Sequence, residues 1–286
     1  MVVALFSLWA CKAPSPAETD GPAPAPATPP PCPQVGPAEV LGVVPSPPAT
    51  EISGVVAAGD RLWVHNDSGD GGKIHALDRT GAPLGFVTVD GSLVDLEDLA
   101  IGPGPDGEPW MFFGDIGDNL RARIDITLYS FPLTEPDGSI VDATAQKFVY
   151  EDGPRDAETL LVDTDGSVWV VSKEMDGRSG LYRATDGVLK RLATLEFGQP
   201  PLGQSTLVTG GDLVPEGLVL RTYLDEAYVW PRYADQDLLT ALQFEPCPIP
   251  VAQEPQGESI AWGPDGFYTI SEGTEPAVNF HPILPE

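Results

Sequence analysis

Basic residues are scarce in this chain, and their scarcity excludes a large class of partners. The 286 residues include 15 Lys and Arg against 43 Asp and Glu, giving a formal net charge of −28 at pH 7. Nucleic-acid binding relies on basic residues that neutralise phosphates, so we predict no nucleic-acid partner. The acidic surface also repels anionic membranes and concentrates cations around the protein. Acidity that serves solubility alone remains the alternative.

Familiar catalytic motifs are also missing. The serine-hydrolase pattern GxSxG, the zinc pattern HExxH and the P-loop do not occur, and the three scattered histidines (His65, His75 and His281) give little support to a serine–histidine triad. The pattern Gly-x-Gly-x-x-Gly at 102–107 matches a dinucleotide fingerprint, but prolines fill its gaps and a strand-like segment follows, so it predicts a hairpin turn. The motifs therefore leave open whether the protein is an enzyme.

No apolar run is long enough to cross a bilayer as a helix. The first eleven residues, MVVALFSLWAC, have about ten apolar positions, where a spanning helix needs about 20. Residues 1–11 resemble the signal peptide and lipobox of a bacterial lipoprotein, with Cys11 as the lipidated residue. A cleaved leader, or one whose true start codon lies upstream, is the alternative. We predict an extracytoplasmic protein, either a cell-envelope lipoprotein of the periplasm or outer membrane or a secreted protein.

Residues 12–38 are dominated by Pro and Ala and show no apolar periodicity. Such a composition favours an extended, disordered stalk of roughly 3.1 Å per residue, which separates an anchor from a folded domain. We therefore predict three parts: the leader at 1–11, the linker at 12–38 and a folded domain at 39–286. Contact with the membrane is expected only through the lipid.

Cysteine is nearly absent. Beyond Cys11 only Cys32 and Cys247 remain, each next to prolines. An even pair in an oxidising compartment predicts a disulfide. Two free thiols are the alternative.

No amphipathic helix of normal length is evident after residue 40, whereas short β-branched and aromatic runs alternate with Gly, Pro and Asp turns. Five similar units, each a pair of apolar segments around a turn, begin the repeats; they span 52–67, 97–115, 158–174, 209–223 and 258–273. A third segment follows each unit and a fourth follows the first three. The pattern predicts an all-β fold, a single β-propeller of four antiparallel strands per blade, with residues 38–44 closing the ring. At about 48 residues per blade we predict five blades, with six as the alternative.

Hairpin geometry predicts where acidic side chains gather. The start of the first strand and the end of the second lie at the same sheet edge, opposite the Asp-Gly turns. We expect Glu97, Glu158 and Glu258, at equivalent positions of three units, to point toward one axis. Calcium accepts six to eight oxygen ligands and would compensate their charge. The predicted metal ligands are Glu97, Glu158, Glu258, Asp67, Asp115 and Asp118.

The same edge carries a second set of candidates. The predicted ligand-binding residues are His65, Asn66, Asp67, Asp115, Lys173, Arg221 and Glu272. The basic members could hold a phosphate or carboxylate group beside a metal. The alternatives stay open: carboxylates that accept backbone N–H bonds and organise loops, and basic residues that only neutralise neighbouring acids.

Several motifs together resemble a family. WVHNDSGD, DLEDLAIGP, GDIGDN, VSKE, LRTY and GESIAWGPDGFYTISEG resemble a group of bacterial secreted β-propeller proteins, mostly uncharacterised, and more distantly the phytase-like and esterase-like propellers. The resemblance covers about 50–280 and implies a propeller fold. Propeller phytases use calcium and a basic lining, and this chain departs from them in its few Lys and Arg.

Two functions follow from these expectations. The first is a monomeric binding module that recognises a small molecule or protein through an acidic face, with calcium as the expected cofactor. The second is a calcium-dependent hydrolase of phosphate or other esters, in which the metal activates water. The first is preferred because no nucleophile and base pair is evident.

Overall fold

β-strands are the main regular structure of the described chain, because short β-branched and aromatic runs are interrupted too often for helices to form. The computed structural model describes residues 28–46, 50–67, 69–198, 205–224 and 226–285. Within them the only helix is α1 (Leu238–Ala241), capped by the Asp237 carboxylate, which accepts the Thr240 N–H. Cys11 and residues 12–27 of the predicted stalk lie outside this part of the chain.

The strands pair into five antiparallel sets of four, which we call units 1 to 5. Unit 1 contains β2 (Ile52–Ala58), β3 (Arg61–Asn66), β4 (Lys73–Asp78) and β5 (Pro83–Val89). Unit 2 contains β6 (Leu96–Pro103), β7 (Pro109–Asp115), β8 (Ile126–Pro132) and β10 (Thr144–Tyr150). Unit 3 contains β11 (Ala157–Val162), β12 (Val168–Ser172), β13 (Arg178–Thr185) and β14 (Val188–Glu196).

The last two units follow the same plan. Unit 4 contains β15 (Val208–Val214), β16 (Gly217–Thr222), β17 (Glu226–Pro231) and β18 (Cys247–Pro250). Unit 5 contains β19 (Gly257–Gly263), β20 (Gly266–Ser271), β21 (Ala277–Pro282) and, from the other end of the sequence, β1 (Glu39–Val43). The pairing of β1 with β21 confirms that residues 38–44 supply the strand that closes the ring.

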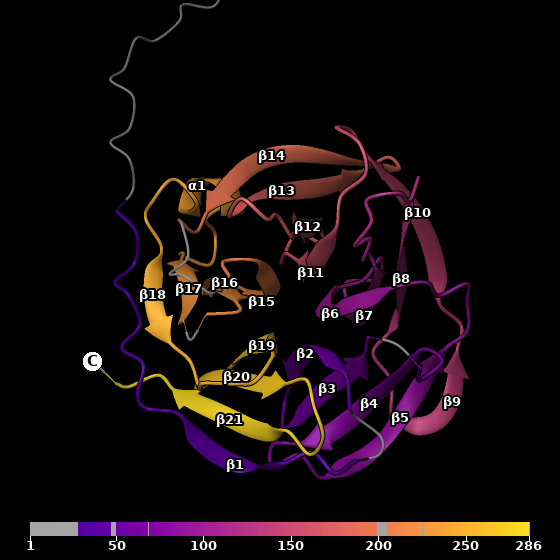
Figure 1. Cartoon of the computed structure of the whole chain (residues 1–286), viewed down its shortest axis with the longest axis horizontal. Coiled ribbons are helices and arrows are strands. Elements are labelled where there is room, and N and C mark those ends of the chain that lie inside the picture. Colours follow the sequence, from indigo (N-terminus) through magenta and orange to yellow (C-terminus); the bar gives the residue numbers. More distant parts are fainter. Residues whose placement is uncertain (1–27, 47–49, 68, 199–204, 225, 286) are drawn as a thin grey trace, which may run out of the picture.

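The units are arranged radially, as in a β-propeller (Figure 1). The first strands pack against one another in the cyclic order β2, β6, β11, β15, β19 and back to β2. Successive strand residues point to opposite faces, so Val55 packs toward unit 5 and Val56 toward unit 2. Leu160 and Leu161 divide in the same way between units 2 and 4. Five apolar clusters between neighbouring units therefore form the core.

Two features of the sheets go beyond the repeat. Strand β9 (Asp137–Val141), between β8 and β10 in sequence, adds a parallel fifth strand to unit 1 through β5. Parallel pairing of β10 with β14 joins units 2 and 3 into one eight-stranded sheet, so the sheets have four, eight, four and five strands. Neighbouring units are thus tied at the outer edge of the ring as well as at its centre.

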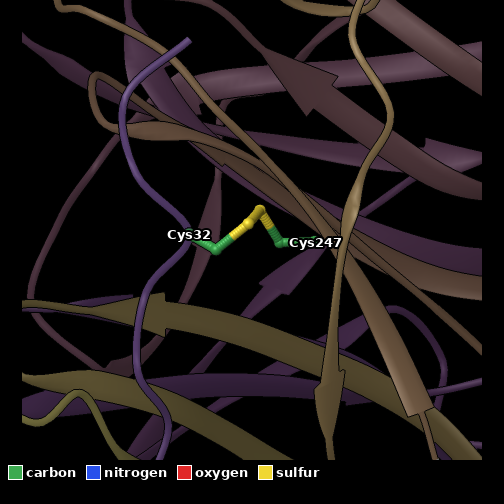
Figure 2. Close-up of a disulfide and its surroundings, with 2 residues drawn as sticks. All are labelled: Cys32 and Cys247. Atoms are coloured by element: carbon green, nitrogen blue, oxygen red, sulfur yellow. A yellow bond between two sulfur atoms is a disulfide. The ribbon is translucent and has the colours of Figure 1, made fainter.

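A disulfide joins Cys32 to Cys247, at the first residue of β18 (Figure 2). The two Cα atoms are 5.6 Å apart, and 215 positions separate the cysteines in sequence. Residues just after Cys32 run beside the end of unit 5, where Gly36 N–H donates to Pro282 O (2.8 Å) and Leu284 N–H donates to Gln34 O (2.7 Å). Residues 34–36 are therefore fastened beside residues 282–284, near the end of unit 5. In the described residues, no helix combines the length and apolar character that a membrane span requires.

Candidate functional site

The hairpins place all five first turns on one side of the ring. The β6–β7 pairing runs from Leu96 opposite Asp115 to Pro103 opposite Pro109, and the other four units repeat this geometry. We call the opposite edge, where inner strands begin and second strands end, the rim. The sequence-based prediction that the Asp-Gly turns share one face is confirmed.

Each inner strand has a register shift immediately after its start. The shifts leave one unpaired residue per unit, and these five residues are Ser53, Glu97, Glu158, Thr209 and Glu258. A β-bulge of this kind bends a strand and redirects a side chain. The three glutamates predicted to share a position are thus equivalent bulge residues. In units 1 and 4 the bulge residue has a hydroxyl that donates to a carbonyl of the next unit: Ser53 to Glu97 O (2.6 Å) and Thr209 to Gly257 O (2.9 Å).

Acidic side chains converge around Glu97. Donor oxygens of Asp67, Asp95 and Glu97 lie within 4.8 Å of one another, and so do those of Glu97, Asp156 and Glu158. Glu97 belongs to both sets, and together the five carboxylates form what we call the rim cluster. The structure brings together Asp67, Glu97 and Glu158 of the predicted metal ligands. Among the described residues, no set close enough to share one ion includes Glu258, Asp115 or Asp118.

Close approach of the GDIGDN backbone encloses the cluster. A Cβ atom on Gly117 would lie 2.0 Å from Glu97 Oε1 and 2.5 Å from Asp95 Oδ2. Only glycine therefore lets this segment pass over the two carboxylates without displacing them.

The rim cluster has too little compensating positive charge. Burial, then the nearby Glu158 and Asp67, raises the pKa of Glu97 well above its usual value. Burial followed by Asp95 raises the pKa of Asp67 to about 6, and its Oδ1 is buried without a hydrogen-bond donor. Burial and then Asp156 raise the pKa of Asp95. Each of these carboxyls would be stabilised in its ionised form by an added cation.

Lys173 connects this cluster to Glu258. Its ammonium forms an ion pair with Glu158 and lies 3.4 Å from the Tyr223 hydroxyl, which donates to Glu258 Oε1 at 3.0 Å. Burial works against the charged lysine, but Glu158 outweighs it and raises the Lys173 pKa. Burial raises the pKa of Glu158 even though Lys173 opposes this effect. Lys173 therefore stays cationic and neutralises part of the cluster. Beside it, a hollow of about 550 Å³ is lined by Asp156, Lys173 and Tyr223, among others.

Asp115 and Asp118 organise the loop that they occupy. The Asp115 carboxylate is fully buried, accepts the Asp95 N–H (3.0 Å) and pairs with Arg123 (2.7 Å). The Asp118 carboxylate accepts the backbone N–H of Ala122 (2.9 Å) and Arg123 (2.8 Å). Both carboxylates therefore accept backbone N–H bonds and organise the loop, which is the alternative to metal binding given in the sequence analysis.

The remaining predicted ligand residues are spread around the rim. His65 is fully buried beside the ring of Phe113, and burial lowers its pKa to about 4. Asn66 donates to Asp70 Oδ2 at 2.9 Å and, with Asp67, lines a smaller hollow of about 240 Å³. Glu272 accepts from the Gln256 side chain, and burial followed by Glu258 raises its pKa.

Arg221 is held within the protein rather than presented at the rim. It pairs with Glu254 (2.7 Å) and donates to the backbone of Ser259 (3.0 Å), so it links unit 4 to unit 5. Glu254 Oε1 in turn accepts from Thr269 and Asn279, both at 2.7 Å. These contacts give Arg221 a structural ion pair across the interface between units.

Sequence reasoning did not select Asp95, Asp156 or Tyr223 as site residues. A signal for the first two was present, because the spacing Asp-x-Glu occurs before two inner strands, at 95–97 and 156–158. Nothing comparable marked Tyr223, whose hydroxyl reaches Lys173 and Glu258 only after unit 4 packs between units 3 and 5.

No protein-family model matches the chain, and no curated protein matches it. Among solved structures, the PQQ-bound aldose sugar dehydrogenase of Streptomyces coelicolor aligns with 12% identity and a TM-score of 0.47, covering 88% of this chain and 99% of that chain. The soluble aldose sugar dehydrogenase of Escherichia coli aligns with 9% identity and a TM-score of 0.49, covering 88% and 100%. A streptogramin B lyase aligns with 11% identity and a TM-score of 0.45, covering 86% and 97%. Because these TM-scores are all below one half, the likenesses carry no argument about this chain's chemistry.

Proposed function

We propose that the protein is an extracytoplasmic, lipid-anchored β-propeller of five blades that acts as a binding module. A divalent cation, for which calcium is the preferred candidate, occupies the rim cluster in this proposal. The convergence of Asp67, Asp95, Glu97, Asp156 and Glu158 carries this proposal. Lipidation at Cys11 and the stalk are parts of the proposal that lie outside the described residues. The Cys32–Cys247 disulfide supports an oxidising compartment.

The cluster has the donor chemistry that calcium prefers. Calcium binds carboxylates, carbonyls and water with six to eight oxygen ligands in flexible geometry, and every donor here is a carboxylate oxygen. A bound cation would also relieve the repulsion that raises the pKa of Glu97, Asp67 and Asp95. The cation would then offer its open coordination positions to an oxygen-bearing ligand.

A calcium-dependent ester hydrolase is the second candidate, favoured by the hollow that places Lys173 and Tyr223 beside Asp156. In such an enzyme the cation would polarise the ester and lower the pKa of a bound water. Lys173 would contribute positive charge rather than act as a base, because Glu158 raises its pKa. Burial raises the pKa of Tyr223, which disfavours it as a base too. Binding is preferred because the described residues that line the hollow include no Ser, Thr, Cys or His side chain.

Calorimetric titration with calcium chloride tests the cation site. We expect the wild type to bind calcium, more tightly at pH 8 than at pH 5 because carboxylates must be deprotonated to bind metal. Glu97→Gln should weaken binding at least tenfold, whereas Glu108→Gln, at an exposed position on the turn side, should not change it. Calcium at about 100 times its Kd should raise the unfolding free energy by about 2.7 kcal/mol. Absence of both binding heat and thermal stabilisation would remove the cation from the proposal.

A panel of phosphate and carboxylate esters separates the two candidates. Calcium-dependent turnover that disappears in both Glu97→Gln and Glu158→Gln would favour the hydrolase. Calcium binding without turnover of any ester in the panel would favour the binding module.

A further inference from the structure

The most exposed large apolar side chains of the described residues gather beside the rim cluster. Leu120 is 88% exposed, Ile124 86% and Met175 84%, and Val94 is 69% exposed nearby. Leu120 and Ile124 lie between β7 and β8, Met175 follows β12 and Val94 precedes β6, so all four are on rim loops. We call the loops 93–95, 116–125 and 173–176 the rim platform. Full burial of such a side chain would contribute about 1.5–3 kcal/mol of hydrophobic free energy, and these exposed side chains do not gain it in the isolated protein.

Hydrogen bonds fix the central loop in this conformation. Asp118 accepts the Arg123 N–H (2.8 Å), and the Arg123 side chain pairs with Asp115 (2.7 Å) and donates to Gly117 O (2.7 Å). Arg121 has φ of 51°, in the left-handed region that a non-glycine residue rarely adopts. The loop is thus built to hold its apolar side chains away from the core, and a binding surface organised in advance loses less entropy on association.

Contacts between loops make the rim platform a single surface. The Arg121 guanidinium donates to Lys173 O at 3.2 Å and pairs with Glu174 at 2.9 Å. Leu120 of unit 2 and Met175 of unit 3 therefore belong to loops that are fastened together.

The charge of this surface indicates what fits it. Its basic side chains are already paired: Arg121 with Glu174, Arg123 with Asp115 and Lys173 with Glu158. Among the described residues, Glu158 alone of the five rim-cluster carboxylates forms an ion pair, and the whole chain carries a formal charge of −28. Complementary potentials attract a cationic partner and repel nucleic acids, anionic membranes and a second copy of this chain.

We propose that the rim platform binds a basic, amphipathic polypeptide segment. Apolar side chains of that segment cover Leu120, Ile124 and Met175, while its Lys and Arg side chains face the rim carboxylates. The inference deepens the binding role proposed above and rests on it. Calcium adds two positive charges to a chain of formal charge −28, so the surface stays acidic and the two occupants are compatible.

Fluorescence anisotropy with a defined probe tests the inference on the full, disulfide-bonded chain. The probe is a labelled 14-residue peptide of Leu and Lys in amphipathic helical order. We expect binding that weakens as salt rises, and at least tenfold weaker binding to Leu120→Ser/Met175→Ser. The matched control Ile140→Ser, which changes a side chain that is 69% exposed on β9, should bind like the wild type.

Comparison probes give results that would overturn the inference. Oligolysine of equal charge should bind at least tenfold more weakly than the Leu and Lys peptide, and a Leu and Glu peptide should not bind. Equal affinity for oligolysine, an unchanged affinity of the double variant, or stronger association with phosphatidylcholine vesicles or with a second copy would each contradict a basic amphipathic partner.

The same measurements distinguish this inference from the cation site. Peptide binding that depends on Leu120 and Met175 in a protein that binds no calcium would support the platform and remove the cation. Calcium binding that depends on Glu97, without platform-dependent peptide binding, would overturn only the inference made here.

Discussion

Buried carboxylates join the inner strands of neighbouring units, which have no hydrogen-bonded ladder between them. The carboxylate of Asp212 in unit 4 accepts two backbone N–H groups, both at 2.8 Å. One is that of Trp262 in unit 5, and the other is that of Leu213, the next residue in the chain. Asp98 in unit 2 repeats this arrangement with Leu160 of unit 3 (2.9 Å). Inner strands pack side by side without pairing, so such side chains satisfy backbone groups that the fold would otherwise bury unpaired.

Asp212 should make stability depend on pH. Burial raises its pKa to about 6, although the two hydrogen bonds oppose the shift. The folded-state pKa exceeds the unfolded value near 3.8, so this contribution is complete below about pH 4 and is lost as pH rises through 6. Urea unfolding should show the wild type less stable at pH 8 than at pH 5, with about 1.4 kcal/mol of the difference from this group, because the rest of its effect falls below pH 5.

Asp212→Asn separates that contribution from other buried acids. The variant should lose stability at both pH values, because an amide nitrogen cannot accept an N–H, and its difference between pH 5 and pH 8 should be smaller than in the wild type. Asp235→Asn, at an exposed position, serves as the control. An unchanged pH dependence in Asp212→Asn would contradict a raised pKa for this carboxyl.

For individual residues, the sequence repeat predicted which side chains occupy equivalent positions in different units. It did not predict which side chains contact one another. Glu97 and Glu158 meet because the repeat gives them the same bulge position in adjacent units. The pairing of Lys173 with Glu158 depends on side-chain directions across two strands. The burial of Arg221 depends on Glu254, which lies in an irregular segment whose path the repeat pattern does not indicate.

At the scale of single elements, the GDIGDN loop depends on one cation. Arg123→Met should leave the fully buried Asp115 without its charge partner, which costs about 3 kcal/mol when a buried pair is broken. Urea unfolding should show this loss, and hydrogen exchange should accelerate across 116–125. Arg178→Met removes an exposed pair with Glu196 and should cost below about 1 kcal/mol. Equal losses in both variants would contradict the bracing role of Arg123.

Strands that follow the hairpin repeat were predictable, and strands at the outer edge were less so. β18 reads CPIP, and its two prolines argue against a central strand, yet proline is tolerated in an edge strand such as this one. β9 is almost entirely exposed, so no alternation of buried and exposed residues marked it. Its pairing with β5 arises from tertiary packing between units 1 and 2.

At the scale of the whole molecule, closure of the ring was predictable because the last unit lacked a fourth segment and the amino-terminal strand had no partner. The parallel pairing of β10 with β14 was not predictable, since it joins two units through only two residue pairs. Because β1 is the fourth strand of unit 5, the last unit is complete only when the start of the domain pairs with β21. Any constraint on the segment before β1 therefore acts on the entire ring.

The Cys32–Cys247 disulfide is that constraint, and its loss should destabilise the whole domain. The bond closes a loop of 215 positions, and removing a native bridge typically costs about 2–5 kcal/mol. Cys32 is exposed, so Cys32→Ser removes the covalent link with little change in packing. We expect a Tm lowered by at least about 4 °C, at about 2–4 °C per kcal/mol.

Reductant provides the matched control for this prediction. It should lower the Tm of the wild type to that of Cys32→Ser and leave the variant unchanged. Amide exchange should also accelerate in β1 and β21, because the segment before β1 would be held only by backbone contacts such as Gly36 with Pro282. A variant that keeps both the wild-type Tm and the wild-type protection of β1 would show that β-strand pairing alone closes the ring, and that the disulfide fixes only where the preceding chain leaves the domain.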